Sequence, residues 1–116
     1  MKHDLSKNVS RETFSLLERL AALVEKWNKS INLISKSTVP NLWERHILDS
    51  VQIYHATQVN FKRWLDIGSG AGFPGLVLAI LAKEKNIDGE IILVESDKRK
   101  CAFLYTVRRD LNLNLS

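Results

Sequence analysis

A glycine-rich segment, residues 66–75, holds the residue types that most directly suggest chemistry. It reads Asp-Ile-Gly-Ser-Gly-Ala-Gly-Phe-Pro-Gly and follows a short, largely apolar run. Glycines allow a sharp turn at the end of a strand and let a ligand approach the main chain, while a following helix presents unpaired N–H groups at its N-terminus. The segment therefore predicts a binding loop for a nucleotide or nucleoside.

Two classes of ligand use such a loop. Gly70, Gly72 and Gly75 fit the G-x-G-x-x-G spacing of dinucleotide sites, where the helix N-terminus holds a pyrophosphate. The acid-x-Gly-x-Gly-x-Gly pattern of S-adenosylmethionine-dependent methyltransferases is filled by Asp66, Gly68, Gly70 and Gly72. A carboxylate is unfavourable beside a pyrophosphate and favourable near an ammonium and a sulfonium. Asp66 therefore favours the methyltransferase, with a nicotinamide-dependent oxidoreductase as the alternative.

Glu95 is a second candidate for cofactor binding, at the carboxyl end of the predicted strand Glu90–Glu95, whose centre is apolar. A carboxylate in that position can accept hydrogen bonds from both hydroxyls of a ribose. Nicotinamide and adenosylmethionine cofactors both carry a ribose. Glu95 therefore supports nucleoside binding without choosing between the two classes.

Three upstream residues, Arg45, His46 and Asp49, are candidates for the substrate side of the site. On a helix, Arg45 and Asp49 share a face and can simply pair with each other. His46 fits helix packing as well as it fits a substrate contact. The sequence shows no catalytic triad and no histidine or cysteine spacing typical of a metal site, so we predict no metal and name no catalytic residue.

Apolar periodicity and turn residues predict the elements that would position these groups. We expect helices over Ser10–Asn28 and Pro40–Tyr54, a strand over Arg63–Ile67, a helix over Leu76–Ala82, a strand over Glu90–Glu95 and a helix over Asp97–Leu111. Ser10 is the expected N-cap of the first helix, and Thr38 is a cap candidate for the second. The core candidates of the last helix include Ala102, Tyr105 and Leu111. This order predicts an α/β protein, with a helical N-terminal segment at 1–60 followed at 61–116 by the first βα units of a Rossmann-like sheet.

Further motifs extend the pattern beyond the glycine-rich segment. They are Asn32-Leu33, Arg45-His46-Ile47-Leu48-Asp49-Ser50, the Gly-x-Pro-Gly ending of the loop, and Lys98-Arg99 ahead of Phe103-Leu104. Together they resemble the ribosomal small-subunit methyltransferase G family, also called glucose-inhibited division protein B, from about Phe14 to Leu111. The resemblance implies a class I methyltransferase sheet and S-adenosylmethionine as cofactor. It also implies methylation of N7 of a guanine in 16S ribosomal RNA, in the bacterial cytoplasm.

The resemblance also assigns roles to residues of the loop. It implies that Gly68 and Phe73 contact the cofactor and that Asp66, Gly70 and Gly72 shape the same loop. Glu95 stands where many family members have aspartate, and the carboxylate is kept. Guanine N7 carries an available lone pair, so its methylation needs no base and depends mainly on positioning.

Length and composition set the remaining expectations. The chain has 116 residues, of which 45% are apolar and 26% charged, which suits a soluble globular domain without a signal peptide or a membrane span. Its single cysteine, Cys101, suggests a reducing compartment and is expected to be a small buried residue. The net charge of +4 permits an RNA partner without requiring one. Several basic residues could contact phosphates: Lys26, Lys29, Lys36, Lys98–Lys100, Arg108 and Arg109. A solvated surface is the more common role of such runs.

Two predicted strands are too few for a doubly wound sheet and leave unpaired edges. The residues at 111–116 alternate like the approach to a third strand. We therefore expect the chain to be an incomplete part of a longer enzyme, or to associate with another copy through its strand edges. A non-catalytic binding or assembly fragment is a further alternative.

Overall fold

The computed structural model describes residues 9–56, 63–67, 72–85 and 90–113. Helical elements make up the N-terminal part, and from the first strand onward strands and helices alternate. In chain order the elements are α2 (Arg11–Asn28), a 3₁₀ turn η1 (Val39–Asn41), a π-helical segment η2 (Trp43–Leu48), α3 (Asp49–Ala56), β1 (Arg63–Ile67), α4 (Gly75–Lys85), β2 (Glu90–Val94) and α5 (Lys98–Leu111).

The two strands form one parallel pair among the described residues. The register runs from Arg63 opposite Glu90 to Ile67 opposite Val94. Because α4 connects them, β1, α4 and β2 make a βαβ unit, as predicted. Both strands end at the same edge of the sheet, where the glycine-rich loop leaves β1 and Glu95 follows β2.

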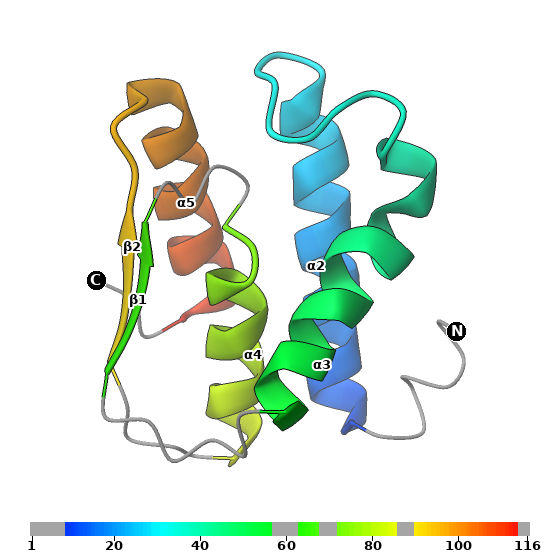
Figure 1. The fold of residues 1–116 in the computed structure, drawn as a ribbon, viewed down its shortest axis with the longest axis vertical. Coiled ribbons are helices and arrows are strands. Elements are labelled where there is room, and N and C mark those ends of the chain that lie inside the picture. Colours follow the sequence, from blue (N-terminus) through cyan, green and yellow to red (C-terminus); the bar gives the residue numbers. More distant parts are fainter. Residues whose placement is uncertain (1–8, 57–62, 68–71, 86–89, 114–116) are drawn as a thin grey trace.

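Helix α4 lies between the strand pair and the N-terminal helices, as Figure 1 shows. It contacts both strands on one side and α2 and α3 on the other. Every residue from Leu76 to Ala82 is buried. A helix covered on all sides must be apolar all round, which accounts for a run that contains no polar face.

Helix α2 forms as its sequence predicts. Ser10 is the N-cap, and its Oγ accepts a hydrogen bond from the backbone N–H of Thr13 (3.1 Å). Leu17, Leu20 and Val24, spaced three or four apart, have no exposed surface and face the core. Residues of α2, α4 and α5 share one core cluster. The division of the chain into segments 1–60 and 61–116 stays a prediction.

Helix α5 corrects two of the expected core positions. Its buried residues are Phe103, Leu104, Val107 and Leu111. Leu111 is therefore confirmed, whereas Ala102 is exposed and Tyr105 is 62% exposed. The stripe at 103, 104, 107 and 111 packs into the shared core, where α5 contacts α2, and positions 102 and 105 are left on its flanks.

The second predicted helix is replaced by three shorter elements. The expected single helix over Pro40–Tyr54 is divided into η1, η2 and α3. Thr38 makes no side-chain cap bond; its Oγ1 is hydrogen-bonded to Ser35 Oγ instead. In a π-helical segment the backbone bonds run from i to i+5, and Ile47 in this wider turn and Val51 after it are both buried. A spacing of three and four residues cannot distinguish this from a regular helix.

Candidate functional site

The candidate site lies at the edge where β1 and β2 end. Asp66 is in β1, with Leu93 as its neighbour on β2. Its side chain, and the whole of Gly68 and Gly70, lie outside the described residues. Gly72, Phe73 and Glu95 are described, and they come from the segments that follow the two strands.

Gly72 adopts a backbone conformation that only glycine takes without strain. Its φ is +83°, and its carbonyl accepts a 2.6 Å hydrogen bond from the N–H of Leu76. A Cβ at this position would overlap the Leu76 side chain, 2.5 Å from Cγ, and lie 3.0 Å from Leu104 Cδ2. The close packing of the turn against α4 and α5 therefore requires glycine at position 72.

Phe73 joins the glycine-rich loop to the upstream motif. Its ring stacks on that of His46, with centroids 5.0 Å apart and planes inclined by 26°. Phe73 also packs against the hydrophobic core, and both side chains are half-buried. The fold thus brings together one residue predicted for the cofactor side and one predicted for the substrate side.

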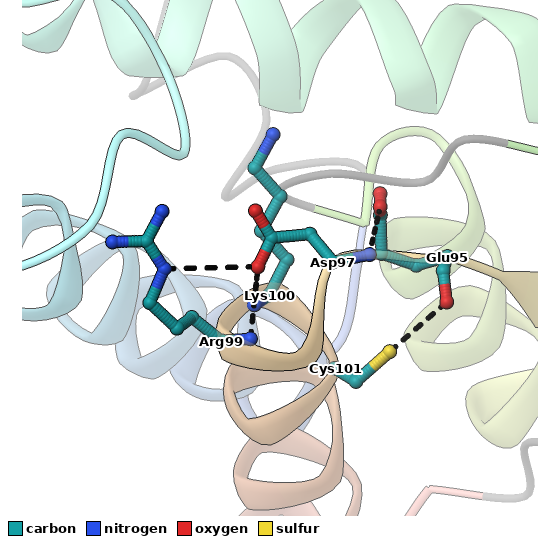
Figure 2. A network of polar contacts seen from close by, with 5 residues as sticks. All are labelled: Glu95, Asp97, Arg99, Lys100 and Cys101. Atoms are coloured by element: carbon teal, nitrogen blue, oxygen red, sulfur yellow. Dashed lines mark hydrogen bonds and ion pairs between the residues drawn. The ribbon is translucent and has the colours of Figure 1, made fainter.

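Glu95 lies at the turn from β2 into α5, shown in Figure 2. Its Oε2 accepts a hydrogen bond from the backbone N–H of Asp97 (3.0 Å), which fixes the carboxylate beside its own main chain. The Glu95 carbonyl accepts a 3.1 Å hydrogen bond from the thiol of Cys101. The sequence predicts that Cys101 is a small buried residue, but it is half-buried. Its hydrogen bond links α5 to the end of β2.

The N-cap of α5 continues this turn. Asp97 Oδ1 accepts hydrogen bonds from the N–H groups of Arg99 (2.9 Å) and Lys100 (3.4 Å). These two bonds, with smaller contributions from the positive charges of Arg99 and Lys100, hold the pKa of the Asp97 carboxyl below its usual value. The cap sets the direction in which α5 leaves Glu95.

The other two substrate-side candidates are not brought into the site by any described contact. Asp49 begins α3 and is exposed. Arg45 lies in η2, and its side chain is outside the described residues. Ser50 Oγ donates a 2.6 Å hydrogen bond to the carbonyl of His46, so the turn that carries His46 is held by α3.

The contact of His46 with Phe73 was not predicted, although both residues were candidates. They are far apart in the sequence, and no pattern of spacing links them. His46 lies in the π-helical segment η2. Such segments often occur at functional sites.

Neither a metal site nor a membrane-spanning helix is found in the parts of the chain that the structure describes. They contain no group of three or more histidine, cysteine, aspartate or glutamate residues that could hold a metal ion. None of the helices in these parts is long and apolar enough to cross a membrane.

These features define a class of protein. A parallel βαβ unit carries a glycine-rich loop after its first strand and a carboxylate after its second, and this arrangement is typical of α/β proteins that bind nucleoside cofactors. Comparison with known proteins makes the class specific. The family model GidB, described as rRNA small subunit methyltransferase G, matches residues 13–116, and the chain belongs to this family.

Similar proteins carry the same description. The chain is 50% identical over 107 residues to a ribosomal RNA small subunit methyltransferase G of Cereibacter sphaeroides, covering 92% of the chain and 52% of that protein. It is 48% identical over 114 residues to one of Jannaschia, covering 98% and 54%. A third, of Bartonella tribocorum, is 51% identical over 110 residues, covering 95% and 51%. The chain thus spans about half the length of the curated relatives it matches.

Proposed function

We propose that the protein takes part in S-adenosylmethionine-dependent methylation of guanine N7 in 16S ribosomal RNA, in the bacterial cytoplasm. The observation that carries the proposal is the meeting of His46 and Phe73, in a chain that belongs to a ribosomal RNA methyltransferase family. It joins the glycine-rich loop to the upstream motif at the edge where Glu95 follows β2. A Rossmann-like methyltransferase sheet is the fold we propose around the observed βαβ unit.

The described residues fit the proposed cofactor. Gly72 lets the glycine-rich loop turn close against α4 and α5 at the edge where the strands end. Glu95 holds its carboxylate at the strand end and, with acceptor sites on two oxygens, is suited to bind the hydroxyls of a ribose. We propose that Asp66, Gly68 and Gly70 complete this cofactor site.

The chemistry asks little of the protein beyond positioning. S-adenosylmethionine supplies an electrophilic methyl group attached to a positively charged sulfur. Guanine N7 presents a lone pair in the plane of the base, so no residue has to remove a proton before the attack. We propose that His46, held against Phe73, lines the substrate side of the site with Arg45 and Asp49 and orients the base.

Ligand binding tests the cofactor assignment. Isothermal titration of the chain with S-adenosylhomocysteine should give saturable binding, and titration with NADH should give none. A Glu95→Gln variant should bind roughly 10-fold more weakly or worse, because hydrogen bonds to a charged group are worth about 1.5–3 kcal/mol. Glu25→Gln, a change of the same kind on the exposed side of α2, should leave binding unchanged. Saturable NADH binding without S-adenosylhomocysteine binding would overturn the methyltransferase assignment in favour of the nicotinamide-dependent alternative.

Methyl transfer is tested separately from binding. Isotope-labelled S-adenosylmethionine is incubated with the chain and with small ribosomal subunits or bare 16S RNA that lack the modification. Transfer of label to guanine N7 supports the proposal. Cofactor binding without transfer by this chain would favour the non-catalytic binding or assembly fragment.

We also propose that the strand edge takes up a second copy of the chain. Within the described residues β2 pairs only with β1. Val94, the last residue of β2, is 44% exposed, and Tyr105 of α5, which lines a pocket together with Val94, is 62% exposed. Sedimentation velocity should show an association that grows with concentration and is weakened by Val94→Lys. Ile53→Lys, at an exposed apolar residue of α3, is the matched control. A concentration-independent monomer would contradict this proposal.

A further inference from the structure

A groove lies between the last turn of α2 and the first turn of α5, outside the site described above. It encloses about 330 Å³. Its lining comes from the end of α2, the turn that follows it and the start of α5: Lys26, Trp27, Ser30, Ile31, Arg99 and Ala102. The groove therefore combines two cations with an indole ring and two aliphatic side chains.

The rim of the groove is positively charged. Lys26 is exposed in the last turn of α2, and the side chain of Arg99 is 72% exposed. Arg99 forms an ion pair with Asp97, with Nε 3.8 Å from Oδ1. That oxygen also accepts the N–H groups of Arg99 and Lys100, and Figure 2 shows the terminal nitrogens of Arg99 directed away from it. Two cations thus face the groove, and Asp97 is committed to the helix cap.

The floor of the groove is apolar and held in place. The Trp27 ring packs edge-on against Phe103, with centroids 5.7 Å apart, and Phe103 has no exposed surface. Ile31 is buried beside it. An aromatic ring fixed by the core, next to exposed cations, is the combination that binds a base and its phosphate in single-stranded nucleic acids.

The groove and the proposed cofactor site share one end of the molecule. Arg99 is in the first turn of α5, which begins just after Glu95, and it lines the groove together with the end of α2. Figure 1 shows the end of α2 and the start of α5 at the same end of the molecule. A strand of RNA in the groove would therefore run toward the edge where β1 and β2 end.

We propose that the groove between α2 and α5 binds an unpaired nucleotide of the RNA substrate outside the methylated guanine. Lys26 and Arg99 contact its phosphates, and the Trp27 ring supports its base. The identification of the polymer as RNA rests on the proposed function. The charges and the apolar floor of the groove, by contrast, are features of the structure itself.

The test measures RNA binding by fluorescence anisotropy as a function of salt. The probe is a labelled oligouridylate of about twelve nucleotides, within the usual size of a single-strand binding site. In the Lys26→Gln/Arg99→Gln variant we expect the slope of log K against log salt concentration to fall by about 1.4, because each lost phosphate contact removes about 0.7 for a single strand. The control, Arg11→Gln/Lys83→Gln, changes the net charge equally at two exposed residues that do not line the groove and should keep the slope.

A second variant tests the floor of the groove. Trp27→Leu removes the ring and keeps an apolar side chain against Phe103; its folding is checked by circular dichroism. We expect it to weaken binding at least about 5-fold, since stacking of a base on an aromatic ring is worth about 1–3 kcal/mol, and to leave the salt slope unchanged.

Three outcomes would overturn the proposal. They are an unaltered slope in the Lys26→Gln/Arg99→Gln variant, an equal change in the control, and equal competition by polyglutamate, which would mark a surface for acidic peptides. S-adenosylhomocysteine binding is measured on the same preparations. Cofactor binding without RNA binding in the groove refutes the groove alone, whereas RNA binding that depends on Lys26 and Arg99 without methyl transfer refutes the proposed function alone.

Discussion

Gly72 shows two requirements acting on one residue. The loop has to turn at the edge of the sheet, which places φ at +83°, and the turn has to lie against Leu76 and Leu104. The need for glycine in such a loop is usually explained by the close approach of a ligand to the main chain. Here the packing against α4 is by itself sufficient to require it.

Gly72→Ala should therefore destabilise the protein even without a cofactor. The left-handed conformation costs about 1–2 kcal/mol for a residue with a Cβ, and overpacking against Leu76 adds about 1–3 kcal/mol. Urea denaturation of the variant should show the free energy of unfolding lowered by the sum of these two costs. An unchanged denaturation midpoint would show that the turn does not pack as closely as described.

The stacked pair of His46 and Phe73 gives a second test at the residue scale. A double-mutant cycle with His46→Ala, Phe73→Ala and the double variant should give a coupling of about 0.5–1.5 kcal/mol in the free energy of unfolding, as expected for aromatic rings in contact. Additive effects, with no coupling, would mean that the rings do not interact in solution. The same variants in the methyl-transfer assay test the role proposed for His46.

At the scale of elements, the ends of α5 show how charge positions a helix. Asp97 caps the N-terminus beside Glu95. At the C-terminus, Arg19 of α2 donates to the carbonyl of Asp110 (2.9 Å), and Lys83 of α4 donates to those of Leu111 (3.3 Å) and Asn112 (3.1 Å). Negative charge at the start and positive charge at the end both favour the helix dipole. Helix α5, and with it the turn at Glu95, is thereby held at both ends.

The lowered pKa of Asp97 predicts how stability depends on pH. Since the folded state favours the carboxylate, the contribution of Asp97 is fully present above its unfolded-state pKa and is lost as the pH falls through the lower folded-state pKa. In Asp97→Asn, which keeps a capping oxygen without the charge, this dependence should be absent. Unfolding midpoints measured from about pH 7 down to about pH 2 should show the advantage of the parent chain shrinking in the acidic range. A constant difference across that range would contradict the prediction.

At the scale of the whole molecule, the helices meet in one core around α4. Phe103 is central to it, because it is fully buried on α5 and its ring contacts Trp27 of α2. Phe103→Ala should lower the free energy of unfolding by about 3–5 kcal/mol, the usual cost of removing a buried aromatic side chain. The measurement is the thermal or urea unfolding transition of the full chain.

Tyr105→Ala is the matched control for this prediction. It removes an aromatic ring from the same helix, but the ring is 62% exposed and its described contact is with Arg108, 5.2 Å away. Its effect should remain within about 0.5 kcal/mol, as for most surface substitutions. Equal losses in both variants would contradict the orientation of α5.

Local patterns in the sequence were sufficient for much of the fold. The cap at Ser10, the periodicity of α2, the two strands and the apolar run of α4 are confirmed, because each depends on neighbouring residues alone. The patterns failed where the tertiary environment decides. Tyr105 is exposed because of how α5 is rotated about its axis, and the helix expected over Pro40–Tyr54 is divided because η2 takes a wider turn.

In the candidate site, too, local patterns account for some features and the tertiary structure for others. The order of the glycine-rich loop, the strands and Glu95 is a property of the sequence, and membership of the family follows from the motifs that it carries. That His46 reaches Phe73, and that Lys26 and Arg99 come to face one groove, depends on how α2, η2 and α5 pack around α4. Contacts between residues distant in the chain depend on how side chains pack in the shared core, and the spacing of residues in the sequence does not predict that packing.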